Sequence, residues 1–347
     1  MRACTDVVES ELRDKHRQMR RDAFLFFRGT YYRWAQLWPD ACKDLRGAPR
    51  VLAVGDLHVG SFGTWRDAEG RMCWGVDDFD DAFQLPYTND LVRLAASVKM
   101  VIDVGDLTVK LRDGCDAILE GYQQGIKSGG CPVVLAEREK NLERLGFAAI
   151  KPPENFWPNL NEKPSLTKGV PHDAKQALEK TLPTPTPNYK IVHRVAGLGS
   201  LGQQRYAAIA DFEGGCIARE AKAMIPSASV WLQGKTAHCQ SNYQPAISSA
   251  IRSHDPYQKI IGVWLMRRLS PDSNPIEIDD LPKQRDEELL LHAMGSEAAN
   301  IHLGTKRQAK NILNDLRKRK PAWLRKAGKR MAKLMQKEWK EFRDSRP

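Results

Sequence analysis

Gly55 to Ala82 holds the residues whose types and spacing are best suited to chemistry. Residues 51–54 (VLAV) lead into Gly55-Asp56, and residues 72–76 (MCWGV) lead into a block of aspartates, Asp77, Asp78, Asp80 and Asp81. The segment between is too rich in glycine for a helix, so we expect two strands whose ends bring the carboxylates together. Carboxylates gather at low cost only around a cation or a shared proton, and their hard oxygens suit Mg²⁺. The alternative is a solvated acidic hairpin with a capping aspartate.

A second candidate segment is the glycine run Gly197-Leu198-Gly199-Ser200-Leu201-Gly202. Strands are expected on both sides of it, over 190–196 and 203–211, and a third expected strand over 216–222 carries Arg219 and Lys222. Glycine lets backbone amides approach phosphate groups, and a cation on a strand neutralises them. A Rossmann loop would open a helix, so the strand after this loop favours a nucleotide-covering loop of the kinase type. Arg219 and Lys222 face opposite sides of a regular strand, so only one of them is expected to face the phosphates.

Apolar periodicity predicts the elements that position these two segments. Residues 8–38 are expected to be helical, and Asn89-Asp90 is expected to cap a helix over 91–104. Further helices are expected over 111–127, 174–179 and 286–303, and further extended segments over 260–269 and 276–281. The chain then divides into a catalytic-loop part of a mostly helical lobe (1–150), a Pro-rich linker (151–188), a small β-rich lobe (189–282) and helices returning to the large lobe with a basic tail (283–347).

Composition narrows the class of protein. The 347 residues are enough for two lobes, and 41% of them are hydrophobic, which is ordinary for a globular protein. No apolar run is long enough to span a membrane, and the N-terminal residues lack the apolar centre of a signal peptide. The seven cysteines are scattered without a CxxC pair, so we expect reduced thiols and a cytoplasmic location.

The motifs together resemble a known family. GDLHVGSFG (residues 55–63) and DDFDDA (residues 77–82) resemble the catalytic loop and the metal-binding block of aminoglycoside-type phosphotransferases. With Phe26-Phe27-Arg28-Gly29, GLGSLG and IAREAK, they resemble in order the hallmarks of the bacterial domain of unknown function 2252, over roughly residues 15–305. These motifs occur in the order that a circular permutation of a kinase chain would produce. The resemblance therefore implies an α+β, two-lobed, protein-kinase-like fold that is circularly permuted, with the catalytic-loop lobe first.

The resemblance also implies roles for individual residues. Asp56 would orient or deprotonate the attacking hydroxyl, and His58 would either assist as a base or hydrogen-bond the loop backbone. Asp78, alone or with Asp80, would bind Mg²⁺, and Ser61 stands where the family has a metal-binding Asn. The phosphates of ATP would lie under Gly197, Gly199, Ser200 and Gly202, paired with Arg219 or Lys222.

The function that this implies is an ATP·Mg²⁺-dependent phosphotransferase acting on an unidentified hydroxyl or amine, which could be part of a small molecule or a protein. Nucleotidyl transfer is a variant that the sequence leaves open. Because Ser61 replaces Asn, a catalytically weak nucleotide-binding relative is one alternative. A nucleic-acid or partner-binding protein is the other.

That second alternative depends on the tail, residues 305–347, which hold 16 Lys or Arg and four Asp or Glu, so the rest of the chain is close to neutral. Two helices are expected there, over 306–318 and 322–343, each with an apolar stripe. Such a basic amphipathic helix can bind nucleic acid. We expect instead that the stripe packs on the large lobe, because soluble proteins rarely leave so many Trp and Met side chains exposed.

Overall fold

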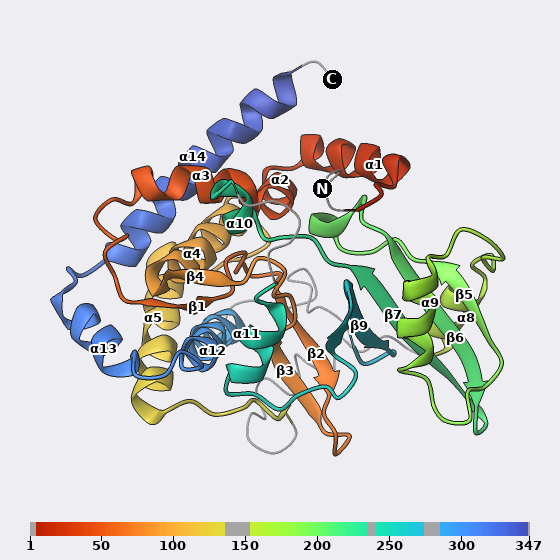
Figure 1. Ribbon diagram of the computed structural model, residues 1–347. Coiled ribbons are helices and arrows are strands. Elements are labelled where there is room, and N and C mark those ends of the chain that lie inside the picture. Colours follow the sequence, from red (N-terminus) through yellow and green to blue (C-terminus); the bar gives the residue numbers. More distant parts are fainter. Residues whose placement is uncertain (1–4, 136–152, 235–240, 274–284, 346–347) are drawn as a thin grey trace.

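The computed structural model describes residues 5–135, 153–234, 241–273 and 285–345 (Figure 1). It is a mixed α+β structure, as expected, with a helical body and a five-stranded sheet beside it. The chain begins with three helices: α1 (Glu9–Arg21), α2 (Ala23–Gly29) and α3 (Tyr31–Ala41). The expectation that residues 8–38 are helical is confirmed, and the structure divides them into three helices. The chain breaks at Asp22, whose side chain caps α2 by accepting a 2.8 Å bond from the Leu25 amide, and again at Thr30.

The helical body is built around four helices, α4 (Tyr87–Val104), α5 (Leu111–Ser128), α12 (Arg285–His302) and α14 (Trp323–Asp344). Helices α5 and α12 approach closely because a glycine of each helix packs against the backbone of the other where they cross. A Cβ at Gly121 would lie 1.9 Å from the His292 carbonyl oxygen, and one at Gly295 would lie 2.1 Å from that of Ile118. Two small antiparallel sheets pair β1 (Arg50–Ala53) with β4 (Phe83–Pro86) and β2 (Phe62–Arg66) with β3 (Met72–Val76). The shorter helices are α10 (Ala228–Leu232), α11 (Tyr243–Ser249) and α13 (Ala309–Lys318).

The five-stranded sheet is antiparallel, in the order β5-β6-β7-β9-β8. Its strands are β5 (Tyr189–His193), β6 (Arg205–Phe212), β7 (Gly215–Ala223), β8 (Lys259–Ile261) and β9 (Trp264–Leu269). Helix α9 (His172–Glu179) packs on one face, and α8 (Pro153–Asn161) packs on part of the other. The segment expected to be a linker therefore contributes two helices to this sheet. The part of the second face that α8 leaves uncovered carries the charged residues of the site.

Three further expectations need correction or fall outside the described residues. Residues 260–269 form two strands rather than one, because Gly262 turns the chain with a φ of 61°. Helix α4 begins at Tyr87, so Asp90 lies inside it and does not cap it. The segment 276–281 lies outside the described residues.

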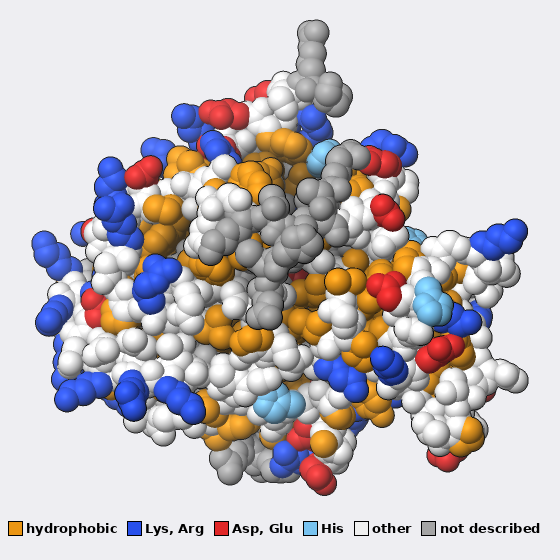
Figure 2. All heavy atoms as spheres, in the orientation of Figure 1, with side chains coloured by type: hydrophobic (Ala, Val, Ile, Leu, Met, Phe, Trp, Pro, Cys, Tyr) orange, Lys and Arg blue, Asp and Glu red, His pale blue; other side chains and the backbone are white. Residues whose placement is uncertain are grey.

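The tail packs against the body, as predicted. One side of α14 is buried against α4, α1, α2 and α3, with Leu324, Met331 and Met335 fully covered. Figure 2 shows Lys and Arg side chains along the edge where α13 lies in Figure 1. Within the described ranges, no helix is both long and apolar enough to cross a membrane.

Candidate functional site

The loop that follows β1 is fixed by buried groups from three helices of the body. Asp90 of α4 accepts hydrogen bonds from the backbone amides of Val54 (2.7 Å) and Gly55 (3.1 Å). His302, at the end of α12, contacts the same carboxylate at 3.1 Å, and Tyr122 of α5 bonds the other ring nitrogen at 2.9 Å. Asp90 and His302 are both inaccessible to solvent. Asp90 is thus structural, as expected, but it caps the loop rather than a helix.

Asp56 is held by a buried arginine that sequence reasoning missed. Arg93 of α4 has no exposed side-chain surface, and its Nε donates a 2.7 Å bond to Oδ1 of Asp56. Its guanidinium also donates to the Phe27 carbonyl oxygen at 3.0 Å and lies 4.0 Å from the Phe27 ring centroid. Burial raises the pKa of Asp56, and Arg93 opposes that rise. The signal available in the sequence was a lone Arg inside the otherwise apolar run LVRLAASV.

His58 and Ser61 hydrogen-bond within the loop itself. The Ser61 hydroxyl donates to the Asp56 carbonyl oxygen and accepts from the His58 amide, both at 3.0 Å. Nδ1 of His58 accepts from the Gly60 amide at 3.1 Å, and Nε2 lies 3.9 Å from Oδ1 of Asp56. Burial, together with the charges of Arg28 and Arg93, lowers the pKa of His58 well below its usual value. His58 is therefore a neutral ring whose Nδ1 supports the loop.

The acidic block lies beside the loop that follows β1 and meets the sheet. Lys222 of β7 donates a short hydrogen bond to Oδ2 of Asp80, while Oδ1 of Asp80 is buried and has no partner among the described residues. Desolvation and the neighbouring Asp78 raise the pKa of Asp80, against the effect of Lys222. Desolvation also acts on Asp78, but Lys222 and Arg267 outweigh it and lower the pKa of Asp78 to about 2. Asp78 is thus ionised beside a carboxyl that lacks a full set of partners.

One face of the sheet presents charged side chains to the acidic block. Register places Arg205 opposite Lys222 and Glu220 opposite Arg267, all on the face that α8 leaves uncovered. Glu220 accepts a 2.9 Å hydrogen bond from Arg205 and also forms an ion pair with Arg194. Desolvation opposes ionisation of Glu220, but the three arginines lower its pKa to about 2. Nε of Arg267 is buried without a partner among the described residues.

The structure separates the two strand cations that the sequence left as alternatives. Lys222 faces the acidic block, and only 2% of its side chain is exposed. Arg219 lies on the opposite face of β7, where it donates to the Thr181 carbonyl oxygen at 3.0 Å and stacks 3.7 Å from the Tyr257 ring centroid. The partner of Lys222 is Asp80, from the acidic block.

The glycine loop turns with left-handed backbone at Gly197 (φ 72°) and Gly202 (φ 91°), around a short 3₁₀ turn, Leu198–Ser200. Ser200 accepts a 2.6 Å bond from Arg205, which ties the loop to the sheet. Helix α1 holds the other side of this loop. Lys15 donates to the Gly199 carbonyl oxygen at 2.6 Å, and Glu11 accepts from the Gly202 amide at 3.2 Å. Nothing in the sequence indicated that an N-terminal helix would hold a loop almost 190 residues away.

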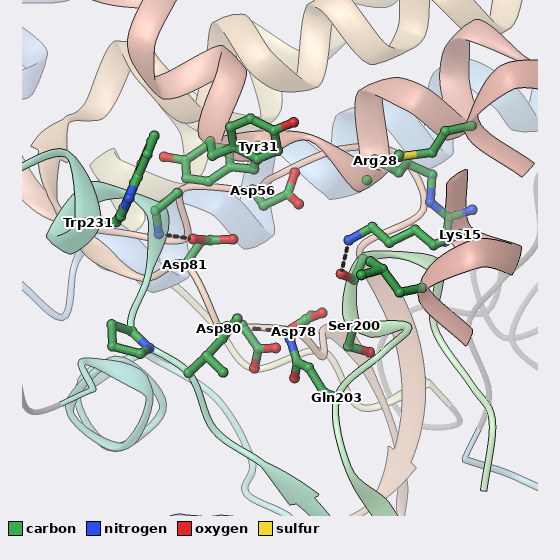
Figure 3. A pocket seen from close by; sticks show the side chains of 18 of the residues that line it. Lys15, Arg28, Tyr31, Asp56, Asp78, Asp80, Asp81, Ser200, Gln203 and Trp231 are labelled. Carbon is green, nitrogen blue, oxygen red and sulfur yellow. Dashed lines mark hydrogen bonds between the residues drawn. The ribbon is translucent and has the colours of Figure 1, made fainter. Parts of the chain in front are cut away.

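Two adjoining cavities open around these groups. The loop cavity, about 340 Å³, lies beneath Gly197–Ser200 and is lined by Lys222 and by arginines of the sheet. The helix cavity, about 400 Å³, lies between α1, α3 and α10. Figure 3 shows the carboxylates of the helix cavity, with Trp231 at one side and Lys15 at the other. The two cavities share Arg28, Asp56, Asp78, Gly199 and Ser200. Asp56 and Asp78 therefore stand at the junction of the two spaces.

The candidate metal residues form a pair rather than a full cage. Across the described ranges, no group of three or more His, Cys, Asp or Glu side chains is placed to hold a metal ion. Ser61 belongs to the lining of the loop cavity but uses its hydroxyl within the loop. A pair of carboxylates suits Mg²⁺, which is commonly bound by one or two carboxylates, waters and the phosphates of a substrate.

Comparison with family models gives one match, over residues 7–144, to DUF2252, described as an uncharacterized protein conserved in bacteria. The match includes α1 to α5, the catalytic-loop candidate and the acidic block, and it ends before the glycine loop. Comparison with curated proteins and with solved structures gave no match. The N-terminal part of this chain, including Asp56, Asp78 and Asp80, is therefore similar to the DUF2252 family.

Proposed function

We propose that this protein transfers a phosphoryl group from ATP·Mg²⁺ to a hydroxyl or amine, using a circularly permuted kinase-like arrangement. The observation that carries the proposal is the convergence on one cleft of Asp56, Asp78 and Lys222 under the glycine loop. These parts come from segments 22 to 166 residues apart in the chain, and they are the parts that kinases use for phosphoryl transfer.

The loop cavity suits the phosphates of a nucleotide. It is lined by Gly197–Ser200 of the glycine loop and by Lys222, Arg205 and Arg267 of the sheet. The unpartnered Nε of Arg267 supports an anionic occupant, because a buried donor without an acceptor costs free energy. Phosphate oxygens would satisfy it.

Asp78 and Asp80 would hold Mg²⁺. The residues fit the ion: Asp78 is ionised, and Oδ1 of Asp80 is buried without a partner among the described residues. When bound, the ion would neutralise charge on the phosphate oxygens.

Asp56 would accept the proton of the acceptor hydroxyl. That oxygen then bonds to the γ-phosphorus, the bond from this phosphorus to the β–γ bridging oxygen breaks, and ADP leaves. Arg93 favours the ionised form of Asp56, against the effect of burial on its pKa, and fixes the orientation of the carboxylate. The proton therefore goes to a carboxylate that is 23% exposed at the junction of the two cavities.

A second candidate function, nucleotide binding without turnover, is favoured by one observation. The hydroxyl of Ser61 donates to and accepts from the loop backbone, so the position where the resembled family has Asn keeps one hydroxyl lone pair in place of an amide carbonyl. Slow or absent transfer would follow from an incomplete metal shell.

The test is product analysis after incubation with ATP and Mg²⁺ and a panel of hydroxyl and amine acceptors. ADP with a phosphorylated acceptor supports phosphoryl transfer. Pyrophosphate with a nucleotidylated acceptor would instead identify the reaction as nucleotidyl transfer. ATP that binds but is never consumed supports the non-catalytic candidate, and no nucleotide binding at all contradicts both.

A further inference from the structure

We infer that the helix cavity binds the acceptor, and that the acceptor is a small alcohol or amino alcohol with an apolar body. The inference rests on the proposed function, because it assigns the acceptor side of the same site. The cavity's volume of about 400 Å³ is that of a small-molecule site. The cavity also reaches Asp56, where the reacting hydroxyl must lie.

The outer wall of the helix cavity calls for an apolar ligand body. Tyr32 and Trp231 stand there with 47% and 53% of their surfaces exposed, and their rings meet edge to face with centroids 6.1 Å apart. Leu12, Met19, Ile225 and Pro226 continue this wall. Large aromatic side chains exposed beside a cavity mark a place where an apolar ligand removes surface from water.

The polar part of the cavity lining offers hydrogen-bond acceptors. Gln203 is 3% exposed, and its Oε1 is buried with no partner among the described residues. Asp81 accepts a 2.7 Å bond from the Ala228 amide, and no ion pair joins it to a cation of the described residues. Figure 3 shows both residues bordering the same space as Asp56, Asp81 on the side of Trp231 and Gln203 on the side of Ser200. A ligand that satisfies Oε1 of Gln203 must donate a hydrogen bond, as hydroxyl and ammonium groups do.

Two cations, Lys15 and Arg28, also line this cavity. Lys15 donates one hydrogen bond to the Gly199 carbonyl oxygen at 2.6 Å and so also holds the glycine loop. The reacting group itself must donate its proton to Asp56, and Oε1 of Gln203 can only accept. The geometry therefore favours donor-bearing acceptors, and binding of an anion at Lys15 and Arg28 is the result that would contradict this preference.

The experiment is ligand-observed NMR on the full chain with three probes that share one ring: 2-phenylethanol, 2-phenylglycinol and phenylacetate. We expect the alcohol or the amino alcohol to bind and phenylacetate not to bind. Trp231→Ala should weaken binding about tenfold, the scale of losing one aromatic contact. Gln203→Leu should also weaken it, while Val263→Ala, at an exposed position outside the cavity, serves as the matched control.

Binding of the alcohol alone identifies a neutral acceptor, and binding of the amino alcohol alone identifies a cationic one. Equal binding of phenylacetate, unchanged binding in Trp231→Ala, or no binding of any probe overturns the inference. ATP·Mg²⁺ binding, measured on the same preparation, separates this proposal from the previous one. A protein that binds ATP·Mg²⁺ but no probe retains the proposed function and loses the acceptor assignment. A protein that binds a probe but no nucleotide retains a ligand site in the helix cavity and loses the proposed function.

Discussion

Replacing Lys222 with methionine tests which strand cation serves the nucleotide. Methionine has nearly the same length and no charge, so the change removes the ammonium with little change in volume. In the structure this ammonium is 2% exposed and pairs with Asp80. A hydrogen bond from a charged donor is worth about 1.5–3 kcal/mol, and loss of one such bond to phosphate corresponds to a Kd about 10 to 150 times higher.

The same substitution has a second consequence, which must be measured beside the first. Lys222 is the main group that lowers the pKa of Asp78 to about 2 against desolvation, so its removal moves that pKa upward. Loss of the ammonium also removes the cation that pairs with Asp80 among the described residues. Calorimetric titration of ATP·Mg²⁺ should therefore be run at pH 7 and at pH 8.5, because a smaller loss at the higher pH would trace part of the effect to protonation of Asp78.

Arg219→Met is the matched control. It removes a positive charge from the same strand, three residues away and on the opposite face. We expect the Kd for ATP·Mg²⁺ to remain within about twofold of the parent. Equal losses in the two variants would refute the reasoning, because the effect would then come from net charge or strand stability. A larger loss in Arg219→Met would mean that the phosphates bind on the Arg219 face of the sheet and not on the Lys222 face.

Three other outcomes follow from the structure. Ser61→Ala should lower the free energy of unfolding by about 1–3 kcal/mol in urea denaturation, because the buried His58 amide loses its acceptor; an unchanged value would mean that the hydroxyl does not support the loop. Met331→Ala on the buried side of α14 should cost about 2–5 kcal/mol, with exposed Lys333→Ala near zero, and equal effects would contradict the packing of the tail. Burial first, and then Asp56, raise the pKa of Asp81 from 3.8 to about 8, so the folded protein retains a proton that the unfolded chain releases. Stability from this group therefore falls as pH rises from about 4 to about 8, and Asp81→Asn should remove that part of the fall in EDTA-treated protein. Parallel curves for the two proteins would contradict it.

The sequence predicted the elements near the site well where a local signal exists. Residues 72–76 form β3 as expected, and the glycine run stands between two strands, where glycine adopts the left-handed turns at low steric cost. The apolar stripe of α14 was also sufficient to predict that the tail packs. In each case the pattern and the physical cause lie in the same stretch of chain.

Contacts between distant segments were not predictable in this way. Nothing near Asp90 indicates that its carboxylate caps the loop at Val54 and Gly55, since a helix cap was the simpler local explanation. The hold of Lys15 on the glycine loop, and that of Arg93 on Asp56, depend on how helices pack. Such contacts follow from tertiary structure, which the local sequence pattern does not specify.

Calorimetric titration of ATP, with Mg²⁺ and with EDTA, into the parent protein and Asp78→Asn tests the central claim most directly. Asp78 is solvent-exposed in the cleft, so the variant should fold normally, which circular dichroism and thermal unfolding would check. We expect the parent to bind ATP in a Mg²⁺-dependent manner and Asp78→Asn to lose that dependence. Equal Mg²⁺-dependent binding by both proteins, or no binding by the parent, would contradict a nucleotide site built on Asp78.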